Sequence, residues 1–154
     1  MSATNPIKRT EYLKQLSRDH HHGLLLCWKI KTGFSKGVAV HRIKAYADWF
    51  YKEHLIPHFE AEEKYIFPVL GNDNELIRQA IEEHRLLSGL FSDTSDIENS
   101  LKQIQTQLEK HIRFEERVLF NEIEKVATPE QLKEFEQNLT EEKFTENLND
   151  EFWK

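Results

Sequence analysis

The chain has 154 residues and a net charge of −6 at neutral pH, from 21 basic and 27 acidic side chains. This length suits one domain with a sizeable core, and an acidic chain without a basic patch is a poor partner for nucleic acid. No apolar run approaches the roughly 18 residues that cross a membrane. The single cysteine, Cys27, excludes an internal disulfide and predicts a reducing, cytoplasmic location.

Low contents of glycine and proline, five and four residues, favour long helices over sheet. Thr10 can cap a first helix over about 11–33, in which leucines and His20 recur at steps of three and four. A long second helix is expected over about 39–70. Pro57 lies inside it and should kink it, because proline removes a backbone donor.

The second half of the chain repeats this organisation. A turn with helix-capping residues at 71–74 precedes a third helix over about 75–91. The fourth helix should run over about 96–126. The sequence Thr128-Pro-Glu-Gln131 has the form of a capping box and predicts a short fifth helix ending near Asn138.

Four long amphipathic helices with short links predict an all-α fold, an antiparallel up-down-up-down four-helix bundle over about 10–127. A short C-terminal helix and an acidic tail, 128–154, should complete a single domain over 1–154. Residues 129–154 hold eight acidic side chains against three lysines, so this end carries five of the six net negative charges. The apolar residues of the tail either pack back on the body or leave the tail mobile, and a mobile tail is a candidate docking segment for a protein partner.

One segment occurs twice. Residues His58–Phe67 read HFEAEEKYIF, and His111–Phe120 read HIRFEERVLF. In both, the histidine and the first residue of a Glu-Glu pair, Glu62 or Glu115, are four residues apart, so they lie on one face of a helix and resemble half of a metal site. The second glutamates, Glu63 and Glu116, lie about 100° around the helix and are interpreted as flanking carboxylates or salt-bridge partners.

Each copy is preceded by an acidic residue followed by histidine, in the pairs Asp19-His20 and Glu83-His84. These histidines also replace an apolar residue on the stripe that should face the axis of the bundle. Burying such groups costs several kcal/mol unless they are paired or bound to a metal. Imidazole and carboxylate together suit iron, manganese or zinc. The alternative is a hydrogen-bonded His–Glu network without metal. The candidate metal ligands are His20, His58, Glu62, His84, His111 and Glu115.

The combined pattern, covering about residues 10–127, resembles the hemerythrin-like, or HHE cation-binding, family. The resemblance implies a four-helix bundle around a non-haem di-iron centre, with two oxo- or hydroxo-bridged ions that bind dioxygen or another small diatomic ligand. The six candidate residues match the family's ligand positions. The resemblance assigns Glu62 and Glu115 as the carboxylates that bridge the two ions.

The chain also departs from the oxygen-carrying members of that family. They have a second histidine on the third helix where this chain has Ser88, and an aspartate five residues after the histidine of the fourth helix, where Glu115 here follows after four. His54 and His21 are the candidates to replace the missing histidine. The choice of His20 over His21 depends on the rotation of the first helix.

The leading hypothesis is a cytoplasmic di-iron protein that binds dioxygen, nitric oxide or iron itself, for sensing, storage or iron handling. No nucleophile–base pair or cofactor loop is found in the sequence, so an organic substrate is not expected and a binding protein is favoured over an enzyme. One alternative is a di-iron oxidoreductase that acts as a ferroxidase or consumes peroxide or nitric oxide. The other is a metal-dependent regulatory module that engages a protein through the acidic C-terminal segment.

Overall fold

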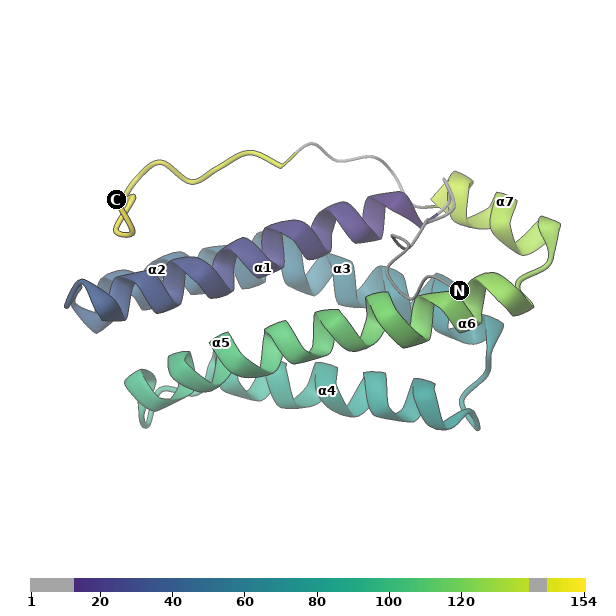
Figure 1. Ribbon diagram of the computed structural model, residues 1–154, viewed down its shortest axis with the longest axis horizontal. Helices are drawn as coiled ribbons and strands as arrows, with labels where there is room; N and C mark the ends of the chain where they lie inside the picture. Colours follow the sequence, from purple (N-terminus) through teal and green to yellow (C-terminus); the bar gives the residue numbers. More distant parts are fainter. Residues whose placement is uncertain (1–12, 139–143) are drawn as a thin grey trace, which may run out of the picture.

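The computed structural model describes residues 13–138 and 144–154, and these residues form helices and connections without a strand (Figure 1). No helix in these ranges combines the length and apolar character needed to cross a bilayer. The proposed cap Thr10 lies outside the described residues. In chain order the elements are α1 (Lys14–Ser35), α2 (Val40–Phe50), η1 (Tyr51–Leu55), α3 (Ile56–Ala61), η2 (Glu62–Ile66), η3 (Phe67–Val69), α4 (Glu75–Ser92), α5 (Ile97–Phe114), η4 (Glu115–Leu119), α6 (Phe120–Val126) and α7 (Pro129–Asn138).

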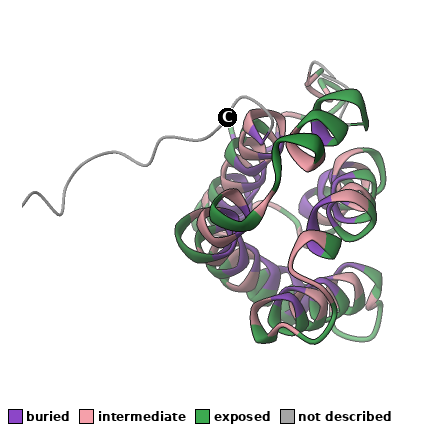
Figure 2. Ribbon diagram, turned by 90° about the vertical axis from the view of Figure 1, so that its right-hand side faces the viewer, coloured by how far each residue is buried: buried purple, intermediate pink, exposed green. Residues whose placement is uncertain are grey.

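The helices form four long rods that lie side by side, and the chain reverses direction from each rod to the next (Figure 1). The first rod is α1, the second runs without a break from α2 to η3, the third is α4, and the fourth runs from α5 to α6. Viewed along their length, the rods surround a common interior toward which their buried residues point (Figure 2). The short helix α7 follows the fourth rod.

Side-chain caps fix several helix boundaries. Asn74 accepts a hydrogen bond from the backbone N–H of Leu76 at 2.8 Å and so begins α4. The predicted capping box before α7 is present: Gln131 N–H donates to Thr128 Oγ1 at 3.1 Å, and Thr128 N–H donates to Gln131 Oε1 at 2.9 Å. Gly37, with φ of 69°, ends the first rod in the left-handed region that favours glycine.

The second and fourth rods contain wide π-helical turns. In η1, Ile56 N–H donates to the carbonyl of Tyr51, five residues back, instead of the usual four. This wide turn directly precedes Pro57, and the rod stays helical through the proline. The wide turn before Pro57 accommodates the missing backbone N–H, so the segment is not broken into two separate helices there.

The apolar core divides into two clusters, one at each end of the rods. Along α1, for example, Leu13 and Leu16 belong to one cluster and Leu26 and Ile30 to the other. His20 lies between these two pairs. The same order holds on the other three rods, so the candidate ligands form one polar layer between two apolar clusters.

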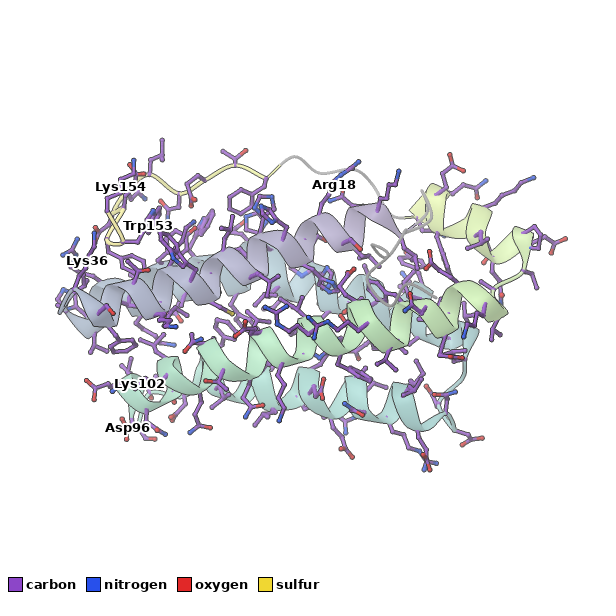
Figure 3. All side chains as sticks on the ribbon, viewed as in Figure 1. Arg18, Lys36, Asp96, Lys102, Trp153 and Lys154 are labelled. Carbon is purple, nitrogen blue, oxygen red and sulfur yellow. The ribbon has the colours of Figure 1, made fainter. Side chains whose placement is uncertain are left out.

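The C-terminal segment, 144–154, packs back on the body along α1 and α2. Phe152 and Trp153 join the larger core cluster, and Lys36 Nζ donates to the carbonyl of Trp153 at 3.0 Å (Figure 3). The acidic side chains of the segment are used within the chain: Glu146 pairs with the buried Lys29 at 2.6 Å, and Asp150 pairs with Arg42 at 2.8 Å. The sequence left open whether the tail packs on the body or is mobile, and residues 144–154 are packed on the body.

Candidate metal centre

The fold brings all six predicted ligand residues together in two overlapping groups. One group contains His20 and His58, the other contains His84 and His111, and both groups share Glu62 and Glu115. Within each group one nitrogen or oxygen atom from each residue lies within 4.8 Å of all the others. The six residues are at most 4 % exposed. Two histidines from different rods and two common carboxylates thus surround each of two positions.

In the first group the histidine Nε2 atoms face the glutamates. His20 Nε2 lies 2.9 Å from Glu115 Oε1 and 3.9 Å from Glu62 Oε2. His58 Nε2 lies 3.3 Å from Glu62 Oε1 and 3.2 Å from His20 Nε2. Four electron-pair donors from three rods therefore converge on one point inside the protein.

The second group has the same arrangement on the other side of the glutamates. His84 Nε2 is 3.1 Å from Glu62 Oε1, and His111 Nε2 is 3.4 Å from Glu115 Oε1. Ligand atoms that lie about 2.0–2.2 Å from one ion are at most about 4.3 Å from each other. The nitrogen–oxygen distances given above, 2.9–3.9 Å, lie below this limit, so these donor atoms are close enough to share an ion.

Four carboxylates form an outer ring around the two groups and contact the Nδ1 atoms of the four candidate ligand histidines. Each Nδ1 pairs with a carboxylate from a neighbouring rod, and each rod supplies one such carboxylate to the next around the site. The pairs are Asp19 with His58 at 2.9 Å, Glu63 with His84 at 2.7 Å, Glu83 with His111 at 2.7 Å, and Glu116 with His20 at 2.6 Å. A carboxylate at Nδ1 keeps the proton there, so the lone pair of Nε2 is directed inward.

The sequence identified the ligand candidates but not this outer ring. Glu63 and Glu116 were expected to be salt-bridge partners, and they are, but their histidine partners lie on other rods. For Asp19 and Glu83 the sequence shows only that each directly precedes a candidate histidine. The available signal is that each candidate ligand segment has an unused acidic residue directly before a candidate histidine or directly after a candidate glutamate.

The wide turns place both copies of the repeated segment in the same way. Glu62 opens η2 and Glu115 opens η4, and the backbone N–H five residues on, from Phe67 and Phe120, donates to the carbonyl of each glutamate. Each phenylalanine therefore lies one wide turn after a shared glutamate and is fully buried in the apolar cluster. This cluster closes that end of the site against water.

The electrostatics of the site favour charged pairs. Burial lowers the pKa of His111, but the nearby negative charge of Glu115 and the hydrogen bond between Nδ1 and Glu83 outweigh it and raise the pKa to about 10. The pKa values of His20 and His58 are also raised, against burial, by their carboxylate partners. Burial would raise the pKa of Glu115, yet its histidine partners hold it well below its usual range. An incoming metal ion therefore has to displace protons.

Hydrogen bonding within the chain does not satisfy this polar layer. Among the described residues, both carboxylate oxygens of Glu62, one of Glu115, and Nε2 of His84 and His111 are buried without a hydrogen-bond partner. His84 Nε2 lies 3.1 Å from Glu62 Oε1, but without the alignment of a hydrogen bond. Unsatisfied buried groups of this kind are costly, and all of these atoms point into the two groups. The donor set therefore fits a pair of cations better than a closed polar network.

The other histidines considered from the sequence lie outside both groups. His21 is exposed, whereas His20 is buried in the site. His54 is half-buried and packs against Trp49, Phe50 and Phe144. Neither histidine replaces the one that is missing at Ser88.

Two hollows reach the site from outside. A cavity of about 590 Å³ is bounded by the buried candidate ligands His20, His58 and His111, and by the half-buried His22, His54 and Phe144. A second hollow of about 750 Å³ is lined by His84, Phe59 and Ser88, among others. The small side chain at Ser88 therefore borders an open space beside one ligand histidine.

Comparison with known proteins gives no further guide: no protein-family model matches the chain, and no curated protein or solved structure is significantly similar to it.

Proposed function

We propose that this protein is a hemerythrin-like metal-binding protein, an antiparallel four-helix bundle that holds two iron ions and binds dioxygen, nitric oxide or iron. The observation that carries the proposal is the pair of four-residue groups sharing Glu62 and Glu115. Two histidines per ion and two common carboxylates suit a pair of ions rather than one. The sequence motifs that resemble the hemerythrin-like family contain the same six residues.

The six candidate ligands would bind the two ions in two sets. His20 and His58 would hold one ion, His84 and His111 the other, and the two glutamates would bind both. The outer carboxylates keep the Nδ1 protons in place and orient the rings, which strengthens Nε2 as a ligand. When bound, iron supplies the open coordination positions at which a small ligand binds.

The surrounding side chains protect the site. Phe120 stacks on His20 with ring centroids 5.2 Å apart, and Phe59 stacks on His84 at 3.9 Å. These rings restrict both the movement of the imidazoles and the entry of water. A small, weakly polar ligand would therefore be favoured over solvent at this site.

Elemental analysis with an optical spectrum tests the proposal on protein made without added zinc or nickel. We expect about two irons per chain, and a sharp loss in His58→Ala and His111→Ala. His41→Ala is the matched control, because His41 is exposed and far from the groups in sequence. Metal-free protein with full helicity and unchanged stability in both ligand variants would refute the proposal.

The hollow beside Ser88 favours a second candidate, a di-iron oxidoreductase that acts as a ferroxidase or consumes peroxide or nitric oxide. An open space next to His84 would leave the second ion more accessible. Stopped-flow mixing of the reduced protein with dioxygen separates the two functions. A spectral change that reverses when dioxygen is removed would refute the oxidoreductase hypothesis. Rapid turnover of peroxide would refute the hypothesis of a reversible binding protein.

A further inference from the structure

We infer that the cavity beside His20, His58 and His111 is a binding site for a neutral aromatic molecule of one or two rings. This inference deepens the proposed function, because the ligand would lie against the proposed metal centre. It adds an organic ligand to a protein for which the sequence predicts no organic substrate. The cavity, its lining and its outer wall support the inference.

The size of the cavity exceeds what a diatomic ligand needs. Pockets for small organic molecules measure about 300–1,000 Å³, and a dry cavity of about 150 Å³ already accepts benzene. The cavity next to the histidines measures about 590 Å³. It therefore has room for a molecule of one or two rings in addition to a small ligand at the ions.

The lining selects against charge. The deep part is formed by the three ligand histidines and by apolar side chains such as Leu55, Leu108 and Ile112, all of them buried. Three charged residues outside the candidate ligands also border the cavity: Arg18 and Glu53 are exposed, and the half-buried Asp19 is paired with His58. A charged ligand would find no buried counter-charge outside the metal ligands, so a neutral ligand is favoured.

Aromatic rings surround the outer part. Phe144 stacks on His22 with centroids 4.0 Å apart and planes at 11°, and it lies 4.7 Å from His54. Phe50 and Phe59 also line the cavity. Aromatic side chains pack against other rings at such distances with a preference beyond their area, which favours an aromatic ligand over an aliphatic one.

The outer wall is held by the packed C-terminal segment. Two residues after Phe144, Glu146 pairs with the buried Lys29, which also lies 4.2 Å from the centre of the Trp153 ring. Phe152 fills the space over Gly33, where an added Cβ would lie 2.8 Å from its ring. These contacts anchor the segment, so Phe144 is a fixed part of the pocket.

Calorimetric titration of the full-length protein with indole, a neutral two-ring probe, tests the inference in both metal-loaded and metal-free protein. Saturable binding is expected, and Phe144→Ala should weaken it about tenfold by removing the outer ring contacts. Leu148→Ala is the control, because Leu148 belongs to the same segment and is 69 % exposed. Equal affinity in Phe144→Ala and the control would overturn the inference.

Methyl NMR locates the probe. Indole should shift the δ-methyl signal of Ile112, which lines the cavity, and leave that of Ile77, buried in the other apolar cluster, unchanged. Gly23→Ala, in which the added Cβ would meet Ile112 Cδ1 at 2.7 Å, should also weaken binding, whereas Gly89→Ala, with open space around it, should not.

The two proposals fail separately. Two irons per chain without indole binding to the loaded or metal-free protein overturns only the aromatic pocket. Indole binding that shifts Ile112 in a protein unable to hold iron overturns only the metal centre.

Discussion

The histidine–carboxylate pairs of the site predict that the unfolding free energy of the metal-free protein falls as the pH rises. The pKa of His111 is about 10 in the folded protein, against an ordinary value of 6.5. A group whose pKa is raised by folding contributes stability that is complete below its unfolded pKa and is lost as the pH rises through its folded pKa. Between pH 6 and pH 9.5, His111 alone should therefore cost the metal-free protein about 4 kcal/mol of unfolding free energy.

Urea unfolding of the metal-free protein at pH 6 and pH 9.5 measures this loss. His20 and His58, whose pKa values are also raised, should increase it. In His111→Gln the dependence should be weaker by most of that amount, while His41→Gln, at an exposed position, should behave like the wild type. An unfolding free energy that is constant or rises over this interval would refute the assignment of the charged pairs.

Three further predictions concern the surroundings of the site. Glu83→Gln weakens the contact that orients the His111 ring and should lower metal affinity about 10–100-fold. Glu98→Gln, on the surface of α5, should leave it unchanged, and competition with a chelator measures both affinities. Phe152→Ala should lower the unfolding free energy by roughly 3–5 kcal/mol without changing the number of metal ions bound, in contrast to Leu148→Ala. Burial raises the pKa of the Cys27 thiol to about 12, so iodoacetamide at pH 8 should modify it only after unfolding, and rapid modification of the native protein would contradict the buried position.

The periodic part of the fold could be predicted from the sequence. Helix periodicity and end signals gave the four long helices and α7, because these depend on residues close together in the chain. Four of the six ligand candidates follow for the same reason, since four-residue spacing places His58 with Glu62 and His111 with Glu115 on one face. His20 and His84 follow from their places on the apolar stripes of their helices.

Features that depend on neighbouring rods could not be read from the sequence. Asp19 and Glu83 each sit beside a candidate ligand in the chain, yet each pairs with a histidine of the next rod. Their role is set by the rotation and spacing of whole helices. The wide turns are similar, because nothing local distinguishes the residues of η4 from an ordinary helix.

The tail shows how packing decides between alternatives that composition leaves open. An acidic end with scattered aromatic residues is compatible with a mobile segment. Burial of Phe152 over Gly33 and the pairing of Glu146 with Lys29 decide for a packed one. Neither contact follows from local sequence, since the partners are more than 100 residues apart.

Anaerobic titration of the metal-free protein with ferrous iron tests whether two ions share Glu62 and Glu115. The wild type should bind two ions per chain. His111→Ala should retain one, on the side of His20 and His58, whereas Glu62→Ala should weaken both, because Glu62 belongs to both groups. A wild type that binds one ion or none, or a Glu62→Ala variant that loses only one ion with the other unchanged, would contradict the account.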